Sequence, residues 1–154
     1  MIVAVEKKVY LCRLFPGEMI TVGATDSEET FEDSGVFFHV YRGSWLSMSG
    51  KPTTPANVAV YQLVEDGKFI EMFESLGGNR RRWESEKQIG SFCQKNPDRL
   101  VGGSFGNFFE LPRGFVARVH KNDSYGYLTV VIDHFVHGHI WRALSGHQVL
   151  ELVS

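Results

Sequence analysis

Hydrophobic and polar residues alternate along much of the chain with a period of two, which is typical of β-strands that bury one face. In the N-terminal half this alternation predicts strands over residues 2–14, 18–23, 36–42, 58–65 and 68–74. Two of the breaks carry turn-forming residues, Phe15-Pro16-Gly17 and Asp66-Gly67. We therefore predict a hairpin around each of these turns.

The C-terminal half continues the alternation and predicts strands over residues 105–111, 114–121, 126–136, 139–144 and 147–153. Two-residue turns at 137–138 and 145–146 place His134 opposite Trp141 and Trp141 opposite Leu150. This register predicts an antiparallel meander in which these three side chains share the face that packs on the core.

Two other segments carry helix signals. Residues 85–95 show the clearer signal, because Ser85 and Gln88 form a capping box and apolar residues follow at helical spacing. A shorter helix is predicted within 25–34, where acidic residues suit a helix N-terminus.

Together these elements predict the α+β class, an antiparallel hairpin and meander sheet with one well-defined helix and one short helix packed against it. A length of 154 residues suits a single domain over 1–154. The polar segment 77–83 interrupts the apolar pattern, so the alternative organisation is two lobes, 1–76 and 84–154, joined by this segment.

The amino-acid composition limits the classes of function that this chain can have. A net charge of -2 with 43% hydrophobic residues excludes a disordered chain and disfavours nucleic acid as a partner. No run approaches the roughly 20 apolar residues of a membrane helix, and the N-terminus lacks the order of charged and apolar residues found in a secretory signal. The two cysteines form no C-x-x-C pair. These features predict a cytoplasmic protein without a membrane partner.

The histidines are the first candidates for chemistry, because neutral imidazoles on neighbouring strands can converge on a metal ion. His134 and His139 share a face in the predicted register, while His120 and His147 lie on adjacent strands. No carboxylate follows at the spacing of a known metal motif, so the sequence assigns no metal and no cofactor. The alternative function that remains open is a metal-assisted hydrolase or an isomerase-like enzyme using these four residues.

The run Arg80-Arg81-Arg82 is a second candidate, because guanidinium groups bind phosphate in bidentate fashion. Trp83 follows directly and would supply a ring on which a base could stack. The sequence therefore suggests a local anion or nucleic-acid contact. The alternative is that the run is a solvated linker, or that its positive charges form ion pairs with the acidic segment 26–33.

The chain holds 12 Phe among its aromatic residues, and four of them form the adjacent pairs Phe37-Phe38 and Phe108-Phe109. Neighbouring residues in a strand point to opposite faces, so each pair predicts a sheet that is covered on both sides. The long loop 43–57 carries Trp45, a composition typical of a binding lid.

Every catalytic motif is incomplete, so the sequence favours a non-catalytic binding or accessory protein, although it leaves open whether the chain is an enzyme. The binding feature is expected to be an aromatic-lined pocket or a homodimer surface. The partner would be a small molecule or a protein. The predicted ligand-binding residues are Trp45, Phe37, Phe38, Phe108, Phe109 and Trp141.

Overall fold

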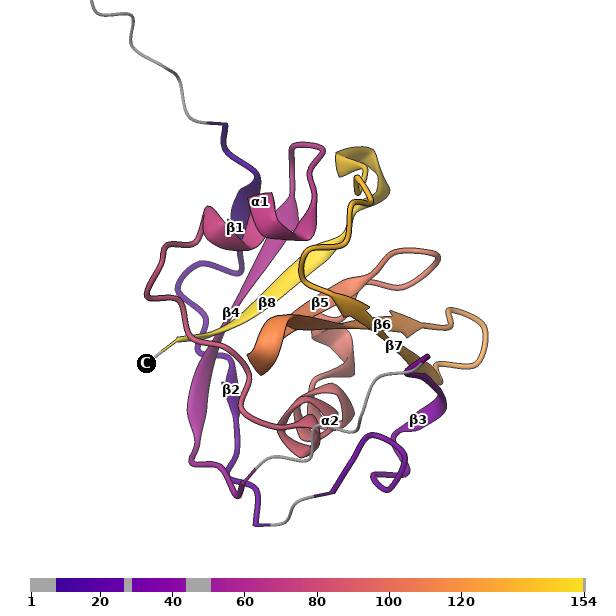
Figure 1. Ribbon diagram of the computed structural model, residues 1–154. Coiled ribbons are helices and arrows are strands. Elements are labelled where there is room, and N and C mark those ends of the chain that lie inside the picture. Colours follow the sequence, from indigo (N-terminus) through magenta and orange to yellow (C-terminus); the bar gives the residue numbers. More distant parts are fainter. Residues whose placement is uncertain (1–7, 27–28, 44–50, 154) are drawn as a thin grey trace, which may run out of the picture.

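The computed structural model describes residues 8–26, 29–43 and 51–153 of the chain. Over these ranges eight strands form one sheet in the order β1-β4-β8-β5-β6-β7-β3, with β2 also paired to β4 (Figure 1). The strands are β1 (Leu11–Leu14), β2 (Thr21–Val22), β3 (Phe37–Tyr41), β4 (Ala56–Leu63), β5 (Asn107–Leu111), β6 (Phe115–Lys121), β7 (Leu128–His134) and β8 (Gln148–Val153). The α-helices described are α1 (Phe69–Glu74) and α2 (Glu86–Lys95).

The sheet is mixed, so the predicted antiparallel α+β fold is wrong. β3 pairs with β7 in parallel, and β5 pairs with β8 in parallel, while the other strand pairs are antiparallel. Most of the regular structure described is strand, and one of the two helices is well defined. The physical reason is that β8 inserts between β4 and β5 instead of pairing with the segment before it. Alternation identifies a strand and its buried face, but it does not identify the neighbouring strand.

The two faces of the sheet carry separate apolar clusters. One cluster contains α2 residues such as Phe92 together with Phe109, and the other contains α1 residues such as Phe69 together with Phe108. Figure 1 shows the two helices on opposite sides of the sheet. The expectation that the Phe108-Phe109 pair covers both faces is therefore confirmed.

The first Phe-Phe pair behaves differently. Phe37 packs against the α2-side cluster, with its ring 5.2 Å from that of Phe31. Phe38 is 62% exposed, because the register between β3 and β7 shifts at this position. Exposed rings are therefore left at the β3 edge of the sheet.

The segment 68–74 forms helix α1, so the predicted hairpin around Asp66-Gly67 is wrong. Phe69, Met72 and Phe73 are the buried residues of this helix, and their spacing of three and four residues places them on one helical face. Gly67 instead forms an isolated bridge with Trp141. The period-two interpretation failed because a six-residue apolar segment fits both periods.

Three further predicted elements are corrected. Residues 139–144 form no strand, so His134 pairs with Phe115 of β6 rather than with Trp141. In the N-terminal segment, β1 and β2 both pair with β4 and not with each other. In the predicted short helix 25–34, residues 27–28 lie outside the described residues, and the part over 29–34 contains a turn but no helix.

Helix α2 matches the prediction closely. The Ser85 side chain accepts a hydrogen bond from the backbone N–H of Gln88 at 3.0 Å, as a helix N-cap does. Apolar side chains of the helix, including Ile89 and Phe92, are buried against the sheet.

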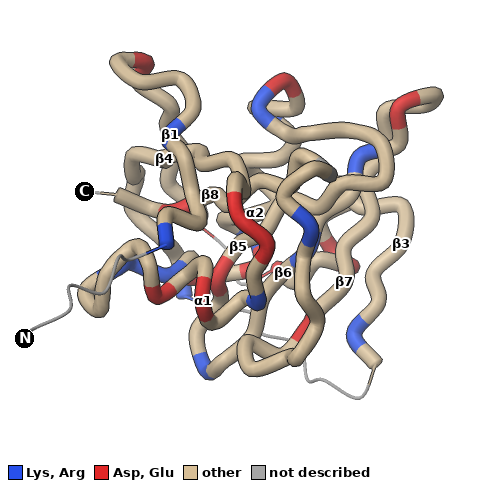
Figure 2. The backbone as a smooth tube through the Cα atoms, turned by 90° about the horizontal axis from the view of Figure 1, so that it is seen from above, with Lys and Arg blue, Asp and Glu red and all other residues tan. Residues whose placement is uncertain are grey.

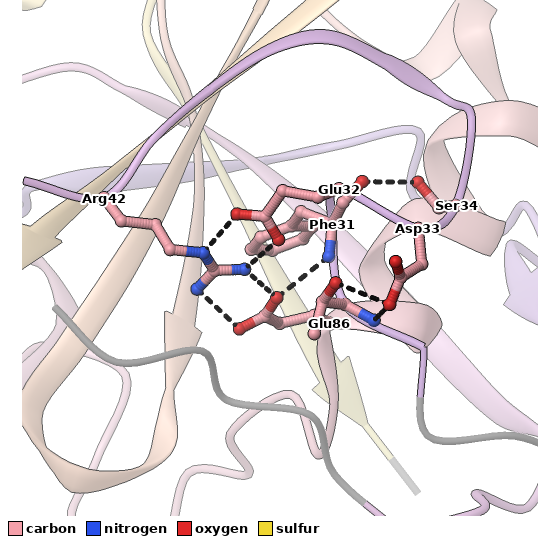
Figure 3. A network of polar contacts seen from close by, with 7 residues as sticks. Phe31, Glu32, Asp33, Ser34, Arg42 and Glu86 are labelled. Atoms are coloured by element: carbon pink, nitrogen blue, oxygen red, sulfur yellow. Dashed lines mark hydrogen bonds and ion pairs between the residues drawn. The ribbon is translucent and has the colours of Figure 1, made fainter.

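A buried ion-pair network ties the 31–42 segment to the start of α2 (Figure 3). Glu86 is fully buried, and its carboxylate accepts hydrogen bonds from both terminal nitrogens of Arg42 and from the backbone N–H of Phe31 at 2.9 Å. Arg42 also pairs with Glu32, and this guanidinium lowers the pKa of Glu32 from 4.5 to about 2. The network therefore fixes β3 against the helix by charge as well as by packing.

The polar segment 77–83 crosses the end of the sheet between α1 and α2. Arg81 forms an isolated bridge with Leu152 of β8, and the backbone N–H of Trp83 donates to the carbonyl of Glu110 at 2.9 Å. Strands from 1–76 flank the strands from 84–154 on both sides within the one sheet described, since β4 pairs with β8 and β3 with β7.

Candidate functional site

The strand registers place ring side chains in a row across the α1 side of the sheet. His39 of β3 pairs with Thr129 of β7, and Thr129 pairs with His120 of β6. His147 directly precedes β8, and its Nδ1 accepts a hydrogen bond from the backbone N–H of Gly106 at 2.8 Å. Imidazoles from segments far apart in the sequence therefore lie on one face.

Three of the four predicted histidines come together around Trp141. The ring of His139 lies 4.4 Å from the Trp141 ring, and the ring of His147 lies 5.2 Å from it. His120 lies close enough that protonation of its ring would disfavour protonation of His147. The sequence thus identified most members of this cluster, although it paired them through a strand that does not form.

His134 is the exception. It lies on the α2 side of the sheet, two residues after the buried Ile132, and its ring stacks on Phe115 at 5.4 Å. The structure therefore separates it from the other three predicted histidines by the thickness of the sheet.

Arg118 connects the histidine cluster to the carboxylate of Asp133. Its Nε donates to Oδ2 of Asp133 at 2.8 Å, and its Nη1 lies 2.8 Å from Nε2 of His120. Because a guanidinium only donates, Nε2 of His120 accepts this bond and its ring is neutral. The same guanidinium lies 5.1 Å from the centre of the Trp141 ring.

Burial and nearby positive charge keep His147 and His120 neutral. Burial lowers the pKa of His147 to about 4, helped by the charges of His120, Arg118 and His139. Burial, and then Arg118, also lowers the pKa of His120. Each ring has one lone pair, and both lone pairs already accept hydrogen bonds. The arrangement favours a positioning role for these two residues over metal ligation.

Within the part of the chain that the structure describes, no group of three or more His, Cys, Asp or Glu side chains is placed to hold a metal ion. The alternative enzyme hypothesis therefore gains no support from the positions of His120, His139 and His147, and His134 is remote from them.

His147 gives the cluster a testable pH dependence. In the unfolded chain its pKa is 6.5, so unfolding takes up a proton between pH 6.5 and about 4. Stability is fully present above pH 6.5 and declines as the pH falls through this window. We expect imidazole NMR to show His147 titrating near pH 4 and His147→Gln to flatten the decline. The exposed His137→Gln is the matched control, and titration of His147 near pH 6.5 would contradict the prediction.

The predicted aromatic residues do not line one pocket. Phe108 packs 4.9 Å from Trp141 in the α1-side cluster, whereas Phe37 and Phe109 belong to the α2 side. Phe38 is exposed at the β3 edge. The predicted lid residue Trp45 lies outside the described residues.

A feature missed from the sequence lies at the β3 edge, where exposed aromatic rings gather on β3 and just before β7, with Tyr41 beside His39. The Phe38 ring lies 4.7 Å from Tyr127, and Tyr125 stacks on Tyr127 at 5.9 Å. We call Phe38, Tyr41, Tyr125 and Tyr127 the edge aromatic surface; each is at least 38% exposed. The sequence signal was tyrosine at alternate positions, 125 and 127, of which Tyr127 falls within the predicted strand 126–136.

The arginine run is engaged by internal carboxylates. Arg80 and Arg82 both pair with Glu110, at 2.7 and 3.2 Å, and Arg81 pairs with Glu84. The acidic segment 26–33 forms ion pairs with other cations instead, since Lys87 pairs with Glu29. Figure 2 shows Lys and Arg interspersed with Asp and Glu along the described chain.

Trp83, proposed above as a stacking ring, is fully buried. Its indole packs against Phe109 in the α2-side cluster, with ring centres 4.9 Å apart. This residue therefore contributes to the core in the folded protein.

None of the helices described has the length and apolar character needed to cross a bilayer. Comparison with known proteins finds no matching family model, no similar curated protein and no similar solved structure.

Proposed function

We propose that the protein is a non-catalytic binding protein of the cytoplasm and that it recognises a protein partner through the edge aromatic surface. The observation that carries this proposal is the ring contact among exposed side chains, with Phe38 4.7 Å from Tyr127 and Tyr125 stacked beside it. Large exposed aromatic patches on small proteins mark interaction sites. Tyrosine in particular supplies contact area together with a hydroxyl that stays hydrogen-bonded.

The rigidity of the edge supports the same proposal. β3 carries Phe38 and Tyr41, and it is fixed in place by Arg42, which pairs with the buried Glu86 of α2. Rings that are already ordered lose little conformational entropy when a partner binds. A second copy of the chain is the first partner to test, because a self-complementary patch makes a closed dimer.

Site-specific photo-cross-linking tests the surface directly. We expect benzoylphenylalanine at Tyr125 to form a defined covalent adduct, either a dimer of the purified protein or a single product in a lysate of the source cells. The matched control places the same probe at Met19, which is 87% exposed and precedes β2 at the opposite end of the sheet order.

Phe38→Ser combined with Tyr127→Ser is expected to abolish the adduct at Tyr125 while leaving the thermal unfolding curve close to that of the wild type, since both rings are exposed. Light scattering over a concentration range separates a dimer from a different partner. A monomer that cross-links equally from both probe positions would rule out the proposal.

A further inference from the structure

An open cavity with a volume of about 630 Å³ lies at the end of the sheet, away from the edge aromatic surface. It is lined by the segment 76–81 and by the last residues of β8, with Leu76 and Val153 as its apolar side chains, since the Leu152 side chain is buried in the α2-side cluster. Its size is in the range of small-molecule sites. Glu151 is the one carboxylate among the described lining residues.

The parallel register of β5 and β8 explains why Glu151 lies beside a second carboxylate. Phe109 aligns with Leu150, so the next residues, Glu110 and Glu151, are neighbours on the α1 side of the sheet. Glu110 is almost fully buried, and its carboxylate accepts hydrogen bonds from Nε and Nη2 of Arg80 at 2.7 and 3.0 Å. Its charge is therefore compensated.

Glu151 has no such compensation. No described residue makes an ion pair with its carboxylate within 4.0 Å, although the Tyr61 hydroxyl hydrogen-bonds to it. Burial and then the charge of Glu110 raise the pKa of Glu151, and the more distant Arg80 and Arg13 only partly oppose this. A half-buried carboxylate gains most from a cation placed at its open side.

The nearby guanidinium groups are engaged elsewhere. Arg80 is held by Glu110 and by the carbonyl of Gly77, and Arg81 is held by Glu84. Arg13 lies over the Tyr61 ring, 5.8 Å from its centre. Glu151 therefore presents to the open cavity a carboxylate that lacks a cationic partner among the described residues.

We propose that this cavity binds a small organic cation, an alkylammonium or alkylguanidinium compound whose charged nitrogen pairs with Glu151 while its alkyl part packs on Leu76 and Val153. This site is independent of the edge aromatic surface. The groups that face Glu151 are Glu110 of β5, Tyr61 of β4, Arg13 of β1, and Arg80 and Arg81 of the 76–81 segment. The bound cation favours the ionised carboxylate, so binding weakens as the pH falls and releases a proton in acid.

An NMR titration of amide resonances in 76–81 and 151–153 tests this proposal. n-Butylammonium and butylguanidinium are the probes, and 1-butanol is the neutral compound of matched shape. We expect saturable shifts with the two cations and none with the alcohol. Glu151→Gln is expected to weaken cation binding about tenfold or more, whereas Glu29→Gln, which removes a carboxylate outside the cavity lining, leaves it unchanged.

A second pair of variants tests the site without removing the charge of Glu151. Gly78 lines the cavity and a Cβ added there has no atom within 4 Å, so we expect Gly78→Leu to occupy the site without a backbone clash. Gly138 is equally open but lies outside the cavity lining, which makes Gly138→Leu the matched control. We expect only Gly78→Leu to abolish cation binding.

Equal shifts with 1-butanol, or cation binding that survives in Glu151→Gln, would overturn the proposal. Photo-cross-linking at Tyr125 is read out at the other end of the molecule, so a failure of cation binding leaves the proposed partner surface standing. The converse also holds, because cation binding does not use Phe38 or Tyr127.

Discussion

Replacing Arg42 with methionine is expected to lower the free energy of unfolding by about 3–5 kcal/mol. Glu86 is fully buried, and in the variant its carboxylate keeps the backbone N–H of Phe31 but loses both guanidinium contacts (Figure 3). A buried charge without its cation is among the most destabilising defects in a protein core. Urea unfolding followed by tryptophan fluorescence measures the change.

The double variant Arg42→Met with Glu86→Met separates the lost pair from lost packing. It removes both charges, so we expect it to recover most of the stability lost in the single variant. Lys87→Met is the matched control on the neighbouring residue, because the Lys87–Glu29 pair is far more exposed, and a loss below about 1 kcal/mol is expected. An Arg42→Met protein as stable as this control would show that Glu86 does not need the guanidinium.

Local signals in the sequence were sufficient for α2 and for the positions of most C-terminal strands. Ser85 and Gln88 specify the helix start through a hydrogen bond between neighbours, so no knowledge of the rest of the chain was needed. β5, β6, β7 and β8 fall within predicted ranges for the same reason, since alternation is a property of each segment alone.

Strand pairing could not be predicted, because it depends on which segment fills each place in the sheet. β8 takes a place between β4 and β5, with parallel pairing to β5, although its predecessor in the chain was the expected partner. α1 was missed for a different reason: Phe69, Met72 and Phe73 fit a helix, but the Asp66-Gly67 turn signal was given more weight.

For the candidate sites too, the residue types could be predicted from the sequence but their spatial arrangement could not. His139 and His147 could be nominated from residue type, but their meeting at Trp141 requires the chain to return to the bridge with Gly67. The cavity beside Glu151 could not be inferred at all, because it depends on the parallel alignment of β5 with β8. Glu151 acquires its environment through burial and through Glu110 and Tyr61, which are distant from it in the sequence.

Trp83→Ala is expected to lower the free energy of unfolding by about 3–5 kcal/mol, the range for truncating a large buried aromatic side chain. Trp83 has no exposed surface, and its ring lies 5.5 Å from Phe92 of α2 and 4.9 Å from Phe109 of β5. It therefore joins the helix to the sheet, and its removal leaves a cavity between them.

A second variant measures the contribution of the Trp83 hydrogen bond separately from that of apolar packing. The indole N–H of Trp83 donates to the carbonyl of Leu150 at 2.8 Å, so Trp83→Phe keeps most of the apolar contact but leaves that carbonyl without its donor. We expect a loss of about 1–3 kcal/mol, between the wild type and Trp83→Ala. Tyr125→Ala at the exposed edge is the control and should stay within about 0.5 kcal/mol of the wild type. If Trp83→Ala were no more destabilising than Tyr125→Ala, the side chain could not be the contact that holds α2 on the sheet.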